Sequence, residues 1–429
     1  MDLSWNTLRA LDEEFGDSFF VMDAGRFESN FHQMRQAFRA HYPNSNLGYS
    51  CKTNYIPRLC QAVIRAGGYL EVVSGMEYEL ALICGATPDR IIFNGPAKRP
   101  AEIEKALLGG AIVNLDGREE VEIVEALAHS YSGRPLLVGL RCNFAVGPGF
   151  SRFGFDVEGG ELAAAFARLD RTPGCDIAGL HCHFSTAART VESFARRTEM
   201  LLEVADRHFT GRAPRFLNVG GGFFGKMPED LGIQFGGHVP SYQEYADAVA
   251  ARVRRRYPDG AGVELVAEPG MAVVSDVLTF VARVVGVKRI RGRHLAVVSG
   301  SVHDVRPSMT DKRLALRVCR SGRQASQDTI AGPVDLVGYT CLEADCLYGG
   351  YPGEIAVGDY ATFENMGAYT IVMRPPFIRP SPPIVAYDDK AGRYQLVRRR
   401  EQPGDVLSTY VIDAVGGDSP PGGRKSPGA

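Results

Sequence analysis

The feature that most constrains the fold is a regular alternation of short apolar runs and amphipathic segments between residues 47 and 268. The segments between the runs repeat apolar residues at three and four positions, which indicates helices. The runs themselves show little alternation, as expected for strands buried on both faces. They cover residues 47–52, 69–74, 91–95, 112–116, 136–142, 177–184, 216–221 and 264–268. Eight strand–helix alternations predict an eight-stranded TIM-like α/β barrel.

The pattern changes after residue 271, where β-rich runs separated by turn residues predict a β-sandwich or β-barrel domain. The early run FFVMD at 19–23 does not fit the barrel count, so we assign it to the same β domain. Residues 415–429 are rich in proline and glycine and predict a disordered tail. The expected organisation is a barrel over 24–271, a β domain from 1–23 and 272–414, and the tail.

Composition excludes several classes of partner. Lys plus Arg is 48 and Asp plus Glu is 50, a net charge of −2 that gives no support for nucleic-acid binding. No apolar run reaches the length of about 18 residues that a membrane span needs, and the N-terminal segment has no apolar signal region. The nine cysteines form no C-x-x-C pair. We therefore expect reduced thiols and a cytoplasmic location.

A barrel of this kind carries its function at the C-terminal ends of its strands. Lys52 ends the first run, in YSCKTN, and a desolvated lysine there could act as a Schiff-base amine. The alternative is a solvated loop lysine. Glu71 nearly ends the second run and could face Lys52 across the mouth; otherwise it is an edge charge.

Two histidines lie in the sixth run, GLHCHFS. A spacing of two places His181 and His183 on one strand face. Metal binding lacks a third ligand with obvious spacing, so no metal is expected. An imidazole packed on an aromatic cofactor is the functional alternative, and a hydrogen-bonded interior histidine is the structural one, above all for His181.

The last two strand ends supply a glycine cluster and a carboxylate. Gly220, Gly221 and Gly222 could present backbone N–H groups to a phosphate, or form a tight turn. Glu268 could hold the protonated ring nitrogen of pyridoxal phosphate, or form an ordinary salt bridge. An amine, a stacking ring, a phosphate cradle and a ring-nitrogen partner are together the parts that pyridoxal phosphate requires.

Ten motifs in order extend this pattern from about residue 19 to 377. They are YSCKTN, EVVSGMEYEL, FNGPAKRPAEIEKAL, VNLDGREEVEIV, SRFGF, GLHCHFST, VGGGF, EPG, GYTCLEAD and ENMGAYT. The sequence resembles the fold-type III decarboxylases that depend on pyridoxal phosphate, the group of diaminopimelate, ornithine and arginine/lysine decarboxylases. Among these branches, its sequence motifs are most similar to those of the diaminopimelate decarboxylases.

The resemblance implies a role for each matching residue. Lys52 would form the Schiff base, His183 would stack on the ring, and Glu268 would pair with the pyridine nitrogen. The full set of implied cofactor contacts is Lys52, Glu71, His183, Thr186, Gly220, Gly221, Gly222, Glu268, Gly270 and Tyr369. Thr186 would offer a hydroxyl, and Tyr369 would reach the phosphate.

The resemblance also implies a reaction and an assembly. Cys341 matches the cysteine that returns a proton to the α-carbon after CO₂ leaves, so Lys52, His183 and Cys341 are the expected catalytic residues. Cys341 and Tyr369 are implied to reach the barrel of the other subunit, which requires a homodimer with shared active sites. The expected activity is the decarboxylation of an α-amino acid.

Three departures from the family pattern lie around the expected pocket. Met271 replaces the arginine of the usual EPGR, which removes one charged contact to phosphate or substrate; Arg189 could compensate. Leu342 separates Cys341 from its glutamate, and the Asp304–Pro307 stretch is one residue shorter than the family's. We expect substrate contacts from Arg306, Glu343 and Asp345, and a substrate that is diaminopimelate-like or a modified or conjugated amino acid.

Two other functions stay open on the sequence. An amino-acid racemase shares the barrel and cofactor, but the cysteine motif around Cys341 favours decarboxylation. A catalytically silent relative that acts as a binding protein is kept open by Met271. The retention of Lys52, His183, Glu268 and Cys341 argues against it.

Overall fold

A computed structural model describes residues 3–146, 149–184, 189–236, 238–258, 262–308, 313–322, 329–388 and 391–412. Thr186 and the expected tail at 415–429 lie outside these residues. Within them, no helix is both long and apolar enough to cross a membrane.

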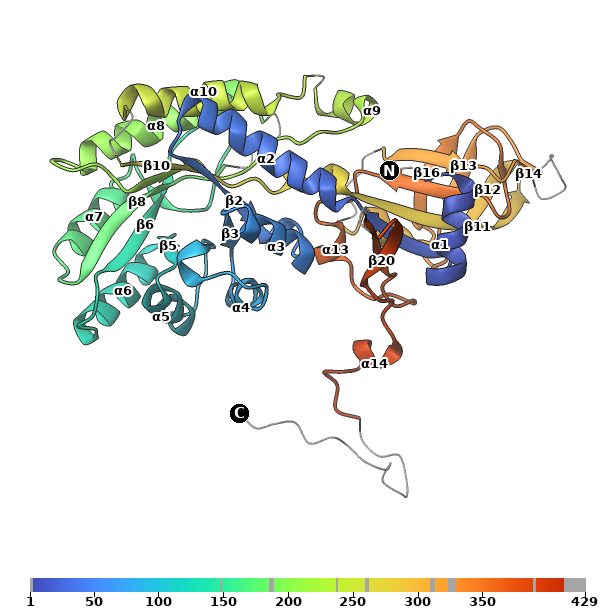
Figure 1. The fold of residues 1–429 in the computed structure, drawn as a ribbon, viewed down its shortest axis with the longest axis horizontal. Coiled ribbons are helices and arrows are strands. Elements are labelled where there is room, and N and C mark those ends of the chain that lie inside the picture. Colours follow the sequence, from blue (N-terminus) through green and yellow to red (C-terminus); the bar gives the residue numbers. More distant parts are fainter. Residues whose placement is uncertain are drawn as a thin grey trace.

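Eight parallel strands close into a barrel, with each strand bonded to the next and the last to the first (Figure 1). In order they are β2 (Ser45–Ser50), β3 (Tyr69–Val72), β4 (Ile91–Phe93), β5 (Ile112–Leu115), β6 (Leu136–Asn143), β8 (Cys175–His181), β9 (Phe216–Asn218) and β10 (Glu264–Ala267). Every strand overlaps a predicted run, which confirms the barrel, although β2 and β8 begin two residues before their runs and β6 ends one residue after its run. The short strand β7 (Phe155–Asp156) pairs in parallel with the last two residues of β6.

Helices follow the strands and cover the outside of the barrel (Figure 1). The longer ones are α2 (Ala24–His41), α3 (Pro57–Arg65), α4 (Gly75–Ile83), α5 (Pro100–Gly109), α6 (Arg118–Ser130), α7 (Glu161–Asp170), α8 (Val191–His208) and α10 (Tyr242–Arg256); α9 (Glu229–Gly232) and α11 (Met271–Val274) are short. α10 shows why such segments are helical. Ser241 and Glu244 form a capping box at its start, and arginines at its last turn complement the helix dipole.

The second domain is built mostly of sheet. Its strands are β1 (Ser18–Met22), β11 (Leu278–Ile290), β12 (Arg293–Val298), β13 (Ala315–Cys319), β14 (Thr329–Ile330), β15 (Val334–Val337), β16 (Cys346–Tyr351), β17 (Ile355–Ala356), β18 (Tyr360–Glu364), β19 (Ile384–Asp388) and β20 (Arg393–Arg398). The N-terminal strand β1 lies between β11 and β19. Its helices are α1 (Trp5–Phe15) and the shorter α12 (Val302–Val305), α13 (Thr370–Met373) and α14 (Pro403–Val406).

The two domains share one continuous apolar core, which joins barrel residues such as Leu47 to sheet residues such as Phe280. The segment after β18 reaches the barrel, where Asn54 Nδ2 donates to the carbonyl of Gly367 at 2.9 Å. This contact brings part of the sheet domain to the C-terminal ends of the barrel strands. The exact limits of the two domains stay predictions.

Candidate active site

Lys52 lies just beyond β2, in a single 3₁₀ turn over Cys51–Thr53, so the strand is shorter than the predicted run. Its Nζ donates to Ser50 Oγ at 2.7 Å and to Glu71 Oε2 at 2.6 Å. Burial lowers the pKa of Lys52, but the charges of Glu71 and Glu268 and the hydrogen bond to Glu71 together outweigh it and hold the pKa above its ordinary value. The side chain is 33% exposed, so this cationic amine is also reachable from the mouth.

A chain of buried polar groups runs from Lys52 to Glu268. Glu71 accepts from Asn94 Nδ2 at 3.1 Å, and the same amide donates to Glu268 Oε1 at 2.8 Å. Asn218 Nδ2 donates to that oxygen at 2.6 Å, and His181 Nε2 lies 3.3 Å from the other oxygen. Burial raises the pKa of Glu268, but the charges of His181 and Lys52 and the hydrogen bonds outweigh it and lower it to about 2. A carboxylate at the end of β10 is therefore ionised.

The two histidines have different surroundings because β8 ends at His181. His181 is a buried interior residue paired with Glu268, as its structural alternative proposed. His183 follows the strand, so the prediction that the two share a strand face is wrong. Burial, together with the nearby Lys52, holds the pKa of His183 well below its usual range, and its Nδ1 accepts from the Gly221 N–H at 2.9 Å. His183 is therefore a neutral ring.

The glycine loop after β9 needs residues without a side chain. A Cβ on Gly220 would lie 2.2 Å from the Cys182 carbonyl oxygen, and one on Gly221 would lie 2.4 Å from that of Glu268. The N–H of Gly222 makes no hydrogen bond to another described residue. The loop thus presents backbone close to the mouth, with one amide available for an anion.

Arg197 of α8 holds this loop from behind and was missed by the sequence reasoning. It is almost fully buried and donates to the carbonyls of Gly221 at 3.0 Å and Phe184 at 3.1 Å. Its guanidinium also lies 3.9 Å from the centre of the Phe194 ring. One side chain therefore fixes the glycine loop relative to the segment that carries His183.

Gly270 and Tyr369 both lie at the turn that carries Lys52. A Cβ on Gly270 would lie 2.2 Å from Thr53 Oγ1, and the N–H of Tyr369 donates to the Thr53 carbonyl at 2.9 Å. The expectation that Tyr369 reaches the barrel of a partner subunit is wrong, since it lies at the mouth of its own barrel. The cause is the contact between the segment after β18 and the barrel.

Cys341 is exposed on the loop between β15 and β16, and the structure does not bring it to Lys52 within one chain. Asp345 is buried and fixes this loop, accepting from Val302 N at 2.7 Å and Thr340 Oγ1 at 2.6 Å. Arg306 donates to the Cys346 carbonyl at 2.7 Å. Glu343 is exposed beside Cys341. Substrate contacts from Arg306, Glu343 and Asp345 stay predictions.

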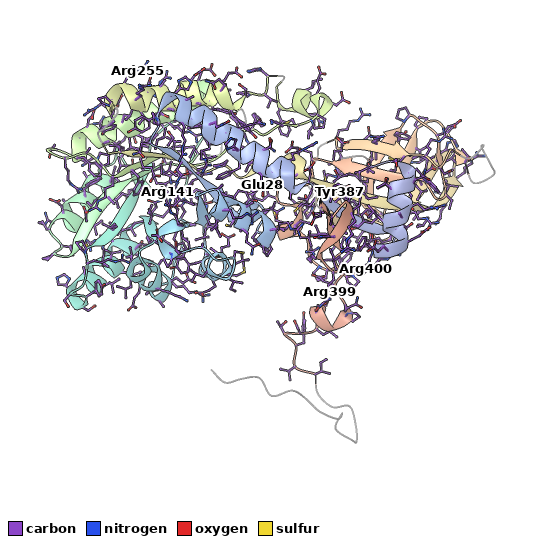
Figure 2. All side chains as sticks on the ribbon, viewed as in Figure 1. Glu28, Arg141, Arg255, Tyr387, Arg399 and Arg400 are labelled. Carbon is purple, nitrogen blue, oxygen red and sulfur yellow. The ribbon has the colours of Figure 1, made fainter. Side chains whose placement is uncertain are left out.

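Asparagines were the main omission from the predicted site. Asn94 follows β4, Asn218 ends β9, and Asn114 of β5 donates to Asn94 at 2.8 Å. Each was detectable as a polar residue at the C-terminal end of a barrel strand, the rule that identified Lys52. Arg141 of β6, labelled within the barrel in Figure 2, forms an ion pair with Asp116, which follows β5, at 2.8 Å.

The residues present fit pyridoxal phosphate. An amine, a neutral imidazole, an ionised buried carboxylate and a loop amide without a partner among the described residues lie at one end of the barrel, on the loops after β2, β8, β9 and β10. These are groups that suit the aldehyde, the ring, the ring nitrogen and the phosphate of that cofactor.

Comparison with known proteins decides the family. Residues 24–275 match the family model of the pyridoxal-dependent decarboxylases, in its pyridoxal binding domain. The chain belongs to this family. It is a decarboxylase that uses pyridoxal phosphate and acts on an amino acid.

Similar proteins cover nearly the whole decarboxylase. The diaminopimelate decarboxylase of Methanothermobacter thermautotrophicus is 26% identical over 94% of both chains, and that of Deinococcus radiodurans is 29% identical over 96% of this chain and 100% of its own. Among solved structures, the diaminopimelate decarboxylase of M. jannaschii in complex with L-lysine has a TM-score of 0.81 at 23% identity, covering 94% of each chain. These structures show the same fold.

Proposed function

We propose that this decarboxylase removes the α-carboxylate of a diaminopimelate-like or otherwise modified amino acid at the barrel mouth around Lys52. The observation that carries the proposal is the buried chain of polar groups from Lys52 through Glu71 and Asn94 to Glu268. It links an amine to an ionised carboxylate. The diaminopimelate decarboxylases among its relatives support the substrate class.

Each residue of the chain has a distinct task in this proposal. Lys52 provides the amine that holds the cofactor, and Glu71, 2.6 Å from its Nζ, accepts or returns the proton of that amine. The ionised Glu268 stabilises a proton on the ring nitrogen. His183 packs on the ring as a neutral imidazole. When bound, the cofactor supplies an acceptor for the electrons of the broken carboxylate bond.

The proton that replaces CO₂ comes from Cys341 of a second copy of the chain. Cys341 is exposed and lies on a loop fixed within its own sheet domain by Asp345, so a second barrel can be its target. We accordingly propose a homodimer in which each sheet domain completes the barrel mouth of the partner. Arg306 and Glu343 contact the substrate in this proposal. The nine free cysteines suit the cytoplasm, where we place the protein.

Asp304 is near, in sequence, to the segment with which the ornithine decarboxylases that this chain resembles select a diamine, and its surroundings favour the diaminopimelate branch. It is buried and forms an ion pair with Arg374, and it also accepts from Ser301 N at 2.8 Å. Its charge is therefore compensated inside the sheet domain. It does not offer a free anion to the distal amine of ornithine or lysine.

The test is CO₂ release by the cofactor-loaded protein from a panel of amino acids. The panel holds meso-diaminopimelate, lysine, ornithine, arginine, glutamate and conjugates of 2,3-diaminopropionate. The proposal predicts release from diaminopimelate or a conjugate in preference to ornithine and lysine. Preferred release from ornithine would contradict the substrate class, and no release from any member with the cofactor bound would contradict the proposal.

A further inference from the structure

Arg189 lies on the loop between β8 and α8, and its guanidinium meets the side chain of Met271 after β10. The distance from Arg189 Nη1 to Met271 Sδ is 3.1 Å. The backbone of Arg189 is held in the left-handed region, at φ 46°, and its carbonyl accepts from the Tyr245 hydroxyl at 2.7 Å. The guanidinium also lies 5.1 Å from the centre of the Phe224 ring. The side chain is thus held by Met271 and Phe224, and the backbone is held by Tyr245.

This cation lacks an anionic partner among the described residues. No carboxylate there forms an ion pair with Arg189, although the side chain is half-buried. Two other arginines of the barrel are held by more acceptors, because Arg141 pairs with Asp116 and Arg197 donates to three carbonyls. A thioether is only a weak acceptor. A partly desolvated guanidinium without an anionic partner favours the binding of an anion.

The guanidinium of Arg189 lies close to the glycine loop after β9. Phe224, under its guanidinium, is two residues after Gly222, whose N–H makes no hydrogen bond to another described residue. Gly225 in turn packs against the carbonyl of Met271, since a Cβ there would lie 2.7 Å from that oxygen. The cation and the available amide therefore belong to one packed unit at the mouth of the barrel.

We propose that Arg189 binds the phosphate of the cofactor, so that the cation at this site comes from the loop after β8 while position 271 is apolar. This inference rests on the proposed function, because it needs the cofactor at the mouth with its phosphate at the glycine loop. A guanidinium makes strong charge-assisted hydrogen bonds to phosphate oxygens. Burial lowers the pKa of Arg189, which agrees with a site that is completed by an anion.

The test compares two ligands that differ only in the phosphate. Dissociation constants of pyridoxal phosphate and of pyridoxal are measured by absorbance titration for the wild type and for Arg189→Met. Loss of one charge-assisted contact predicts that affinity for pyridoxal phosphate falls about 10- to 100-fold, while affinity for pyridoxal is unchanged. Arg189→Lys retains part of the affinity because it keeps the charge. Arg196→Met, an exposed arginine of α8, is the matched control and binds both ligands as the wild type does.

A double variant tests the location of the charge. In the double variant Arg189→Met with Met271→Arg, the positive charge is supplied by position 271 in place of position 189, and the affinity for pyridoxal phosphate recovers. An equal loss for pyridoxal in Arg189→Met would show a structural role and overturn the inference. An unchanged cofactor affinity with a raised KM would assign Arg189 to the substrate carboxylate and also overturn it. A wild type that binds neither ligand would instead refute the proposed function on which it rests.

Discussion

Replacing Glu268 by glutamine tests whether the buried polar chain stabilises a carboxylate rather than a hydrogen-bonded polar group. The amide keeps the size of the side chain and can still accept from Asn94 and Asn218. It removes the negative charge that faces His181 at 3.3 Å. Glu264→Gln, at the opposite end of the same strand, is the matched control, because Glu264 bonds only to the Tyr69 hydroxyl among the described contacts of its side chain.

The magnitude follows from the lowered pKa. A carboxyl with a pKa of about 2 instead of 4.5 is stabilised in its ionised form by about 3 kcal/mol relative to the unfolded chain. Because the folded pKa is depressed, this stabilisation is complete above pH 4.5 and is lost as the pH falls towards 2. We expect Glu268→Gln to lower the free energy of unfolding by about 3 kcal/mol at pH 7 and by roughly half as much at pH 3.

The assay is urea denaturation of the cofactor-free protein, followed by circular dichroism at both pH values. In the cofactor-loaded enzyme, Glu268→Gln no longer stabilises the proton on the ring nitrogen of the cofactor. If that loss is of the same size, CO₂ release is about 100-fold slower than in the wild type. Equal unfolding midpoints of wild type and variant at pH 7 would refute the reasoning. So would a pH-independent difference, since it would show a packing effect in place of a charge.

Three further changes have defined outcomes. Lys52→Ala abolishes CO₂ release, and turnover retained with added cofactor would contradict the assignment. Cys341→Ala slows turnover but leaves the bound-cofactor absorbance intact. Mixing equal amounts of Cys341→Ala and Lys52→Ala chains restores about a quarter of the wild-type activity, because half of the dimers then hold one complete site out of two. No recovery of activity on mixing would contradict the shared site. Burial raises the pKa of Glu77 to about 7, so its contribution to stability falls as the pH rises from 4.5 to 7. Between pH 4.5 and 7, the free energy of unfolding of Glu77→Gln therefore rises by about 3 kcal/mol relative to that of the wild type, as measured by urea denaturation. The same pH dependence of stability in both proteins would contradict this.

The barrel was predictable because its strands are buried on both faces and read as apolar runs between helical segments. The predicted strands were too long at the ends that matter for chemistry. Lys52, His183 and Gly221 all lie beyond the last strand residue, because the chain leaves the sheet to bring these groups to the mouth. The strand-face argument for His181 and His183 failed for that reason.

Contacts between distant segments were not readable from the sequence. The bond from Tyr369 to Thr53 joins the two domains within one chain, and only the fold shows that it does so. Arg189 was a candidate from the sequence to compensate for Met271, but its contact with Met271, across 82 positions, is seen only in the fold. Asn94 and Asn218, by contrast, obey the strand-end rule and could have been included. What the sequence lacks is therefore the packing between loops and the last residue of each strand, whereas the polar groups near the strand ends are readable from it.

The central claim is that the barrel mouth around Lys52 is the catalytic centre of this decarboxylase. Borohydride reduction of the cofactor-loaded protein fixes the cofactor to the amine that holds it, and mass mapping of the peptides identifies that amine. We predict the added mass on the peptide that contains Lys52, and none in Lys52→Ala. The added mass on another lysine, in a protein that still releases CO₂, would contradict the account.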